Sequence, residues 1–165
     1  MRQVVCDTGP ILHLLEIKCI ELLSFLGCTH IPPTVAQELD QHFPEWLQRK
    51  PECILITPLS TTSYTQAASW QAAKMLHCGE AESLALAHQV ICDWYLTDDA
   101  AARIYASSLG IEVHGTLGVI LWAAAKGKLD RLEADSLLDK LVSDSSLWIS
   151  PRIVAEAKAA LDDLI

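Results

Sequence analysis

Short, β-prone apolar runs that alternate with segments of helical periodicity are the feature that most constrains the fold of this chain. The runs lie at residues 4–6, 28–31, 53–57, 94–97 and 111–113. Strands separated by helical segments pair in parallel through crossover connections. The 165 residues, of which 51% are hydrophobic, suffice for one core. We therefore predict an α/β three-layer sandwich with a central parallel sheet of four or five strands. It would be one domain over residues 1–165, with a C-terminal helix at about 151–164.

Acidic residues follow two of the predicted strands. Asp7 comes directly after residues 4–6, and Asp98 and Asp99 come after residues 94–97. Sites in open parallel sheets form at the carboxyl ends of strands, so these carboxylates become neighbours if their strands lie close together. Clustered carboxylates repel one another and raise each other's pKa unless a cation is present. A hard divalent ion such as Mg²⁺ or Mn²⁺ removes that repulsion through oxygen ligands.

Each acid also has a purely structural interpretation. Asp7 precedes Thr-Gly-Pro and can shape a turn, and Asp98 can cap the helix that follows it. Glu80 and Glu82 lie in the first turn of a predicted helix, where acids are ordinarily favourable. Because they are two residues apart, they point to different sides of the helix, and we expect at most one to face a pocket. Glu38, taken alone, reads as an exposed helix residue.

The order of these acidic motifs resembles the PIN domain family. The matching segments are residues 4–8 (VVCDT), 31–39 (IPPTVAQEL), 79–87 (GEAESLALA) and 96–99 (LTDD). Residues 110–121 resemble the continuation seen in a VapC-like, incompletely characterised PIN subfamily. Each motif is short, but their order and spacing together are specific, and the resemblance covers residues 3 to about 160.

The resemblance implies a divalent-metal-dependent endoribonuclease that cleaves RNA phosphodiester bonds, often as the toxin of a toxin–antitoxin pair. Carried over by position, the acidic set comprises Asp7, Glu38, Glu82, Asp98 and Asp99. The resemblance implies that Asp7, Glu82 and one of the two adjacent aspartates hold Mg²⁺ or Mn²⁺. Register after Thr97 favours Asp99, whereas the strand end favours Asp98, so both are retained. Glu82 stands where many family members carry aspartate, which changes the reach of that carboxylate.

Two further residues enter the predicted site on the substrate side. Thr8 matches a family position at which a small hydroxyl residue lines the site. Arg103 follows Asp99 by one helical turn and is placed to reach a phosphate, or else to pair with acids at the surface.

Charge and hydropathy bear on the partners. The net charge of −9 lacks the basic face that nucleic-acid binders usually carry, so a bound metal or a partner would have to offset it. The resemblance implies an RNA substrate, a cognate antitoxin protein and a homodimer formed around Trp122 and its neighbouring apolar helices. The longest apolar stretch, residues 117–125, is shorter than the ~18 residues that span a bilayer, and no signal-peptide pattern is present. We therefore expect a cytoplasmic protein that does not enter a membrane.

Three other functions remain open. The acidic charge and the Glu82 departure leave room for a non-catalytic PIN-like binding module. A phosphotransfer domain would use Asp7 as nucleophile, although Gly9 stands where a haloacid-dehalogenase-like site has a second aspartate. A purely structural interaction protein would use the acids only to cap helices.

Overall fold

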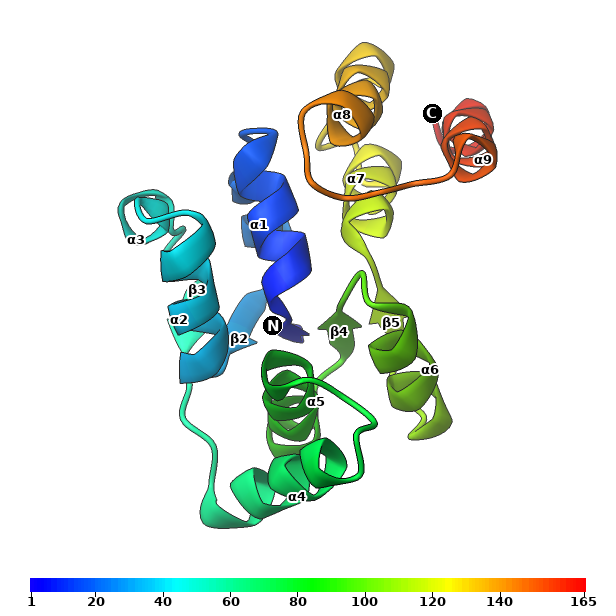
Figure 1. The fold of residues 1–165 in the computed structure, drawn as a ribbon. Helices are drawn as coiled ribbons and strands as arrows, with labels where there is room; N and C mark the ends of the chain where they lie inside the picture. Colours follow the sequence, from blue (N-terminus) through cyan, green and yellow to red (C-terminus); the bar gives the residue numbers. More distant parts are fainter.

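A five-stranded sheet, in which every neighbouring pair is parallel, lies at the centre of the computed structural model, which describes all 165 residues. Its strands are β1 (Gln3–Cys6), β2 (Cys28–Ile31), β3 (Ile54–Ile56), β4 (Trp94–Leu96) and β5 (Val113–His114). They are ordered β3-β2-β1-β4-β5 across the sheet. Helices cover both faces (Figure 1), which confirms the predicted α/β three-layer sandwich.

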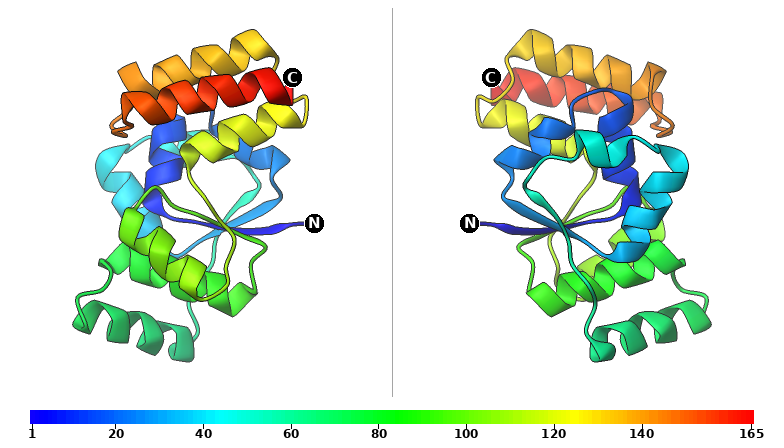
Figure 2. Two further views of the ribbon diagram at one scale, coloured as in Figure 1. Left: turned by 90° about the vertical axis from the view of Figure 1, so that its right-hand side faces the viewer. Right: turned by 90° about the vertical axis from the view of Figure 1, so that its left-hand side faces the viewer.

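The helices form two layers around this sheet. They are α1 (Thr8–Glu16), the 3₁₀ helix η1 (Ile20–Phe25), α2 (Pro33–His42), α3 (Trp46–Arg49), α4 (Thr61–Ala72), α5 (Cys78–Val90), α6 (Ala100–Ser108), α7 (Thr116–Ala125), α8 (Arg131–Ser143) and α9 (Pro151–Leu164). Figure 2 shows α1, α7, α8 and α9 on one side of the sheet and α4, α5 and α6 on the other. None of these helices combines the length and the hydropathy that crossing a membrane requires.

Local sequence sets the starts of several helices. Asp7, Ser60, Asp130 and Ser150 each place a side-chain oxygen on a free N–H group in the first turn of the following helix. Helix α9 also has Pro151 in its first turn, where a missing N–H costs least. These caps explain why the C-terminal helix begins at the predicted residue.

Two predicted elements differ in the structure. The apolar pattern before Gly27 predicts a short helix at residues 18–26, whereas the structure has the 3₁₀ helix η1 there, beginning two residues after Lys18, whose φ is 59°. The hydrogen bonds at its ends, such as Leu22 N–H to Cys19 O, span three residues. The last strand begins at Val113 rather than at residue 111, and α3 lies in a segment with no predicted element.

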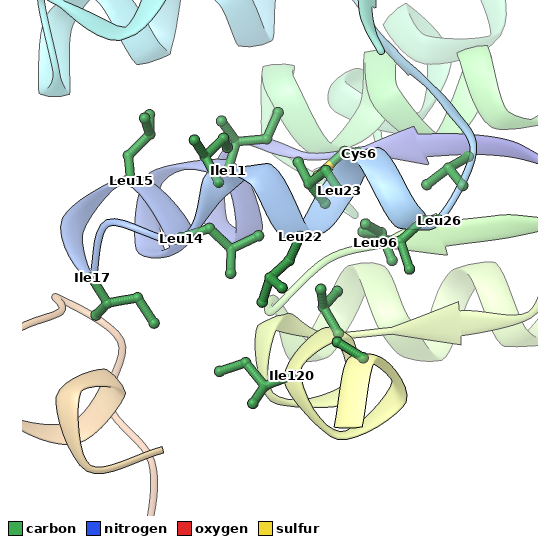
Figure 3. Close-up of a cluster of buried hydrophobic side chains, with 14 of the residues drawn as sticks. Cys6, Ile11, Leu14, Leu15, Ile17, Leu22, Leu23, Leu26, Leu96 and Ile120 are labelled. Carbon is green, nitrogen blue, oxygen red and sulfur yellow. The ribbon is translucent and has the colours of Figure 1, made fainter. Parts of the chain in front are cut away.

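The sheet separates two apolar cores, in keeping with the alternation of side chains along a strand. Val4 and Cys6 of β1 face a core of 27 buried residues beneath α1, η1, α2, α7, α8 and α9, part of which is shown in Figure 3. Val5 and Tyr95 face a core of 12 buried residues beneath α4, α5 and α6. Both faces of the sheet are therefore covered at its centre, which explains the continuous apolar runs at residues 4–6 and 94–96.

The acidic motifs meet where the strand order changes direction. Strand β1 pairs with β2 on one side and with β4 on the other, with Cys6 opposite Leu96. The Asp7 N–H donates to Leu96 O at 2.9 Å, so the residues after both strands leave the sheet side by side. This is the crevice at which open α/β sheets bind their ligands.

Candidate active site

A polar pocket of about 250 Å³ opens at the carboxyl ends of β1 and β4 and has no hydrophobic residue in its lining. Its lining residues are Asp7, Thr8, Gly9, His13, Glu38, His77, Gly79, Glu80, Asp98 and Asp99. Four of the five predicted acids and Thr8 thus converge from the ends of two strands and from helices α1 and α2. Glu82 is the predicted acid that is absent from this lining.

Asp7 and Asp99 are linked through one buried hydroxyl. Asp7 is 6% exposed, and its Oδ1 accepts the Thr8 N–H at 2.8 Å. Its Oδ2 accepts the Thr97 hydroxyl at 3.1 Å, and the same hydroxyl oxygen accepts the Asp99 N–H at 3.2 Å. Thr97 therefore fixes the spacing between the acid after β1 and the acid after β4.

Burial raises the pKa of Asp7 from 3.8 to about 7. Hydrogen bonds from the Thr8 N–H and the Thr97 hydroxyl act against that rise, while the charges of Glu80 and Glu38 add to it. Asp7 is therefore partly protonated near neutral pH unless a nearby cation compensates its charge. Strongly perturbed carboxylates of this kind, set in a cleft, are typical of functional sites.

The pKa of Asp98 is shifted in the opposite direction, and both of its oxygens accept hydrogen bonds. Its Oδ1 accepts the Thr116 N–H at 2.8 Å, and its Oδ2 accepts the Thr116 hydroxyl at 2.6 Å and pairs with His13 Nδ1 at 2.8 Å. Burial alone would raise the pKa of Asp98, but these three contacts outweigh it and leave the pKa below 3.8. Asp98 therefore joins α1, β4 and α7 through three hydrogen-bonded contacts.

Asp99 keeps one oxygen available. Its Oδ1 caps α6 by accepting the Ala102 N–H at 2.7 Å, and Oδ2 has no donor within the protein. The two adjacent aspartates therefore differ in the number of hydrogen bonds that they accept, and both line the polar pocket.

Two glutamates complete the acidic rim. Glu38 Oε2 accepts the Thr8 hydroxyl, and Glu80 Oε2 accepts the His77 N–H at 2.9 Å, whereas Oε1 of each glutamate has no donor within the protein. Glu38 lies against the backbone of Gly79, where a Cβ atom would stand 2.6 Å from Oε1. Only glycine allows α5 to approach this carboxylate so closely.

The structure places Glu82 outside the lining of the polar pocket. Glu82 is 8% exposed, its Oε2 accepts the Thr34 hydroxyl, and its Oε1 accepts the Cys78 S–H at 3.7 Å. Two residues along a helix turn a side chain by about 200°, so the two glutamates cannot share a face. The rotation of α5 against the sheet brings Glu80 to the pocket and turns Glu82 towards α2.

Several site residues were missed because their contacts join distant segments. His13 and Thr116 hold Asp98, and Thr97 connects Asp7 with Asp99. Thr116 follows the carboxyl end of β5, so the rule that places sites at strand ends supplied a signal for it. Nothing in the sequence marks His13, which lies among apolar residues of α1.

Arg103 lies beside the polar pocket rather than within it. Its Nη1 donates to Thr97 O at 3.2 Å, and its guanidinium helps to line a second cavity that shares Asp98 with the polar pocket. None of the ion pairs in the protein involves Arg103.

The donor chemistry of the polar pocket fits a divalent cation. Asp7, Glu38, Glu80 and Asp99 offer hard carboxylate oxygens, and Asp7 carries a pKa that a nearby cation would return to its ordinary range. No three His, Cys, Asp or Glu side chains are grouped closely enough to enclose an ion by themselves. Mg²⁺ commonly keeps several waters and binds through only one or two carboxylates, which suits an open acidic rim.

A methyl group at position 79 tests whether the position of the Glu38 carboxylate matters for metal binding. We expect Gly79→Ala to keep the fold, because alanine favours helix and only the end of a flexible side chain is displaced. The Glu38 carboxylate must move, and we expect Mn²⁺ affinity to fall by roughly 10–100-fold, as for other changes that displace groups around a metal. Isothermal titration with Mn²⁺ measures this. Gly118→Ala, in α7 with its nearest contact at 3.5 Å, is the matched control and should leave affinity unchanged.

Comparison with known proteins agrees with this geometry. Residues 3–163 match the model of a domain family, DUF3368, which is described as a PIN domain. No curated protein matches the chain. The family match covers every strand and every residue of the polar pocket.

Proposed function

Because this chain belongs to the PIN domain family, whose members are in general nucleases that use divalent metals, we propose that it is a metal-dependent endoribonuclease and that the polar pocket is its active site. We take residues 1–165 as one such domain, which acts on RNA phosphodiester bonds in the cytoplasm. The observation that carries the proposal is the convergence of Asp7, Glu38, Glu80 and Asp99 on one pocket, together with the raised pKa of Asp7.

Each acid has a distinct part in this proposal. Asp7 and Asp99 would hold Mg²⁺ or Mn²⁺, since both line the pocket and Thr97 fixes their spacing. Glu38 and Glu80 would hold water beside the cation, and one of them would accept the proton of the attacking water. The bound cation supplies Lewis-acid activation of water and neutralises the charge that develops on the phosphate.

The remaining polar residues act through these acids. The Thr8 hydroxyl orients Glu38, and the Thr97 hydroxyl orients Asp7. Asp98 is a positioning residue: with His13 and Thr116 it holds the turn after β4, from which Asp99 projects. In this proposal the predicted acid Glu82 supports the packing of α5 on α2, and Glu80 takes its place at the cation.

Cleavage of a labelled RNA with Mg²⁺ or Mn²⁺, compared with EDTA, tests the proposal directly. A nuclease yields fragments only with the metal and stops when the metal is chelated. The alternative, a non-catalytic PIN-like module, is favoured by the net charge of −9 and by the lack of a preformed ion cage. That alternative predicts intact RNA in both conditions.

The division of labour between the adjacent aspartates gives a second test. We expect Asp98→Ala to lower the free energy of unfolding by about 3 kcal/mol, because it leaves the Thr116 N–H, the Thr116 hydroxyl and His13 without their acceptor. Asp99→Asn keeps a helix-capping oxygen, so we expect a change within about 0.5 kcal/mol but a loss of cleavage. Urea denaturation and the cleavage assay separate the two effects. Equal stability losses in both variants would contradict this assignment.

The resemblance to VapC-like proteins extends the proposal to partners. We propose that the chain is the toxin of a toxin–antitoxin pair and that it forms a homodimer near Trp122. The partly buried Trp122 ring packs edge-on against the buried Trp94, at 5.7 Å between centroids, so the helix that would form this interface is firmly held. Light scattering of the purified protein tests the dimer, and co-purification with the product of an adjacent small reading frame tests the antitoxin.

A further inference from the structure

A second cavity, of about 420 Å³, adjoins the polar pocket, and Asp98 lines both. We call it the Trp148 pocket and define it by Arg103, His114, Leu117, Leu147, Trp148 and Ile149, among its lining residues. Half of its lining is hydrophobic, whereas the polar pocket has no hydrophobic residue. Its volume lies within the ~300–1,000 Å³ typical of small-ligand sites. An apolar compartment thus opens directly beside the proposed site of phosphodiester cleavage.

Trp148 is largely exposed, although the residues on both sides of it pack against the larger core. Its side chain is 82% exposed, while Leu147 and Ile149 on either side are partly buried against the larger core. The loop between α8 and α9 is therefore anchored by its neighbours, and the indole projects from an ordered backbone. A large apolar ring held in solvent at the rim of a cavity provides a surface for another flat apolar group.

The negative net charge of the protein makes an uncharged contact surface important for RNA binding. The net charge of −9 opposes RNA binding at long range. Arg103, in the Trp148 pocket, has no carboxylate partner among the ion pairs of the protein. A third cavity contains Lys74 and shares Glu80 and Asp99 with the polar pocket. The basic side chains of Arg103 and Lys74 therefore line cavities that adjoin the acidic pocket, where phosphates of a bound strand would find positive charge.

We propose that the Trp148 pocket binds an unpaired nucleobase of the RNA, next to the phosphate in the polar pocket. The base stacks on the indole of Trp148, and the Arg103 guanidinium contacts a flanking phosphate. The base is unpaired because a helical duplex keeps its bases stacked inside, whereas single strands can turn a base outwards. This inference rests on the proposed function for its substrate class, and it adds that affinity comes from stacking rather than from a basic face.

Binding of a short, single-stranded 2′-O-methyl RNA of mixed sequence tests this inference, with a denaturing gel after the measurement to verify that the oligonucleotide is intact. We expect Trp148→Ala to weaken binding on the order of tenfold in the presence of Mn²⁺, a loss typical of one base–aromatic stack. Trp148→Phe should restore most of the affinity, and Mn²⁺ affinity should be unchanged in both variants. Tyr64→Ala is the matched control, because Tyr64 is a 60% exposed aromatic on α4, on the opposite side of the sheet.

Two results would overturn the inference. The first is equal oligonucleotide affinity in Trp148→Ala and wild type, which would leave the pocket to a protein partner such as a hydrophobic peptide. The second comes from photocrosslinking of a 4-thiouridine oligonucleotide: adducts on residues 147–150 support the inference, and adducts found only elsewhere contradict it. The outcomes separate from those of the proposed function. An uncleaved but Trp148-dependent RNA would remove the nuclease and keep the base site, whereas cleaved RNA with no Trp148 dependence would do the reverse.

Discussion

Replacing Asp7 by Asn is expected to slow metal-dependent RNA cleavage by ~10³-fold or more. The variant removes the negative charge that most directly holds the cation, and metal activation contributes several kcal/mol to such reactions, with each tenfold in rate worth ~1.4 kcal/mol. The fold should persist, because asparagine has the same shape and keeps an oxygen for the Thr8 N–H. Cleavage of labelled RNA under saturating Mn²⁺, with circular dichroism to verify the fold, measures the effect.

Asp163→Asn is the matched control for this experiment. Asp163 is an exposed acid on α9 with no hydrogen bond to the rest of the protein, and the same change of charge there should leave cleavage intact. Retained metal-dependent cleavage in the Asp7 variant would show that the acid after β1 does not hold the cation.

Binding of Mn²⁺ is expected to strengthen about 100-fold between pH 5 and pH 7. Burial raises the pKa of Asp7 to about 7, so below that value the cation must displace a proton, and affinity changes by about tenfold for each pH unit. Above pH 7 the dependence should level off. Isothermal titration in buffers of different ionisation enthalpy also reports the proton released, which should approach one per ion near pH 6. Affinity that does not vary over this range would contradict the role of Asp7.

The same group affects the stability of the metal-free protein in the opposite direction. In the unfolded chain Asp7 ionises near pH 3.8, whereas in the folded protein it ionises near 7, so its contribution is most favourable below 3.8 and is lost as pH rises to 7. A pKa displaced by this amount corresponds to about 4 kcal/mol. The difference in unfolding free energy between wild type and Asp7→Asn isolates this contribution, since other carboxylates titrate equally in both.

Much of the architecture could be predicted because each strand is a short apolar, β-prone run that can be identified from its local sequence. Residues 28–31 match β2 at both ends, and Asp7 was placed correctly at the end of β1. Parallel pairing follows from the alternation of strands with helices. That β1 and β4 are neighbours does not follow from this alternation. It depends on how the two cores pack, and it is this adjacency that brings Asp7 to Asp99.

The choice among neighbouring acids required the structure for a different reason. Sequence spacing showed that Glu80 and Glu82 face different ways, but which one faces the pocket is set by the rotation of α5 against β1. Likewise, Asp98 and Asp99 are distinguished by partners in α1 and α7, namely His13 and Thr116, which no local pattern connects to them. Which member of each pair of nearby acids lines the pocket, and how many hydrogen bonds it accepts, therefore depends on tertiary contacts.

Diffraction from crystals soaked in Mn²⁺ and recorded near the manganese absorption edge would test the central claim most directly, because anomalous scattering locates the ion itself. We predict a peak in the polar pocket in direct contact with the carboxylates of Asp7 and Asp99, with Glu38 or Glu80 bound directly or through water. A pocket without a manganese peak at saturating Mn²⁺, with Asp7 and Asp99 in the positions described above, would contradict the account.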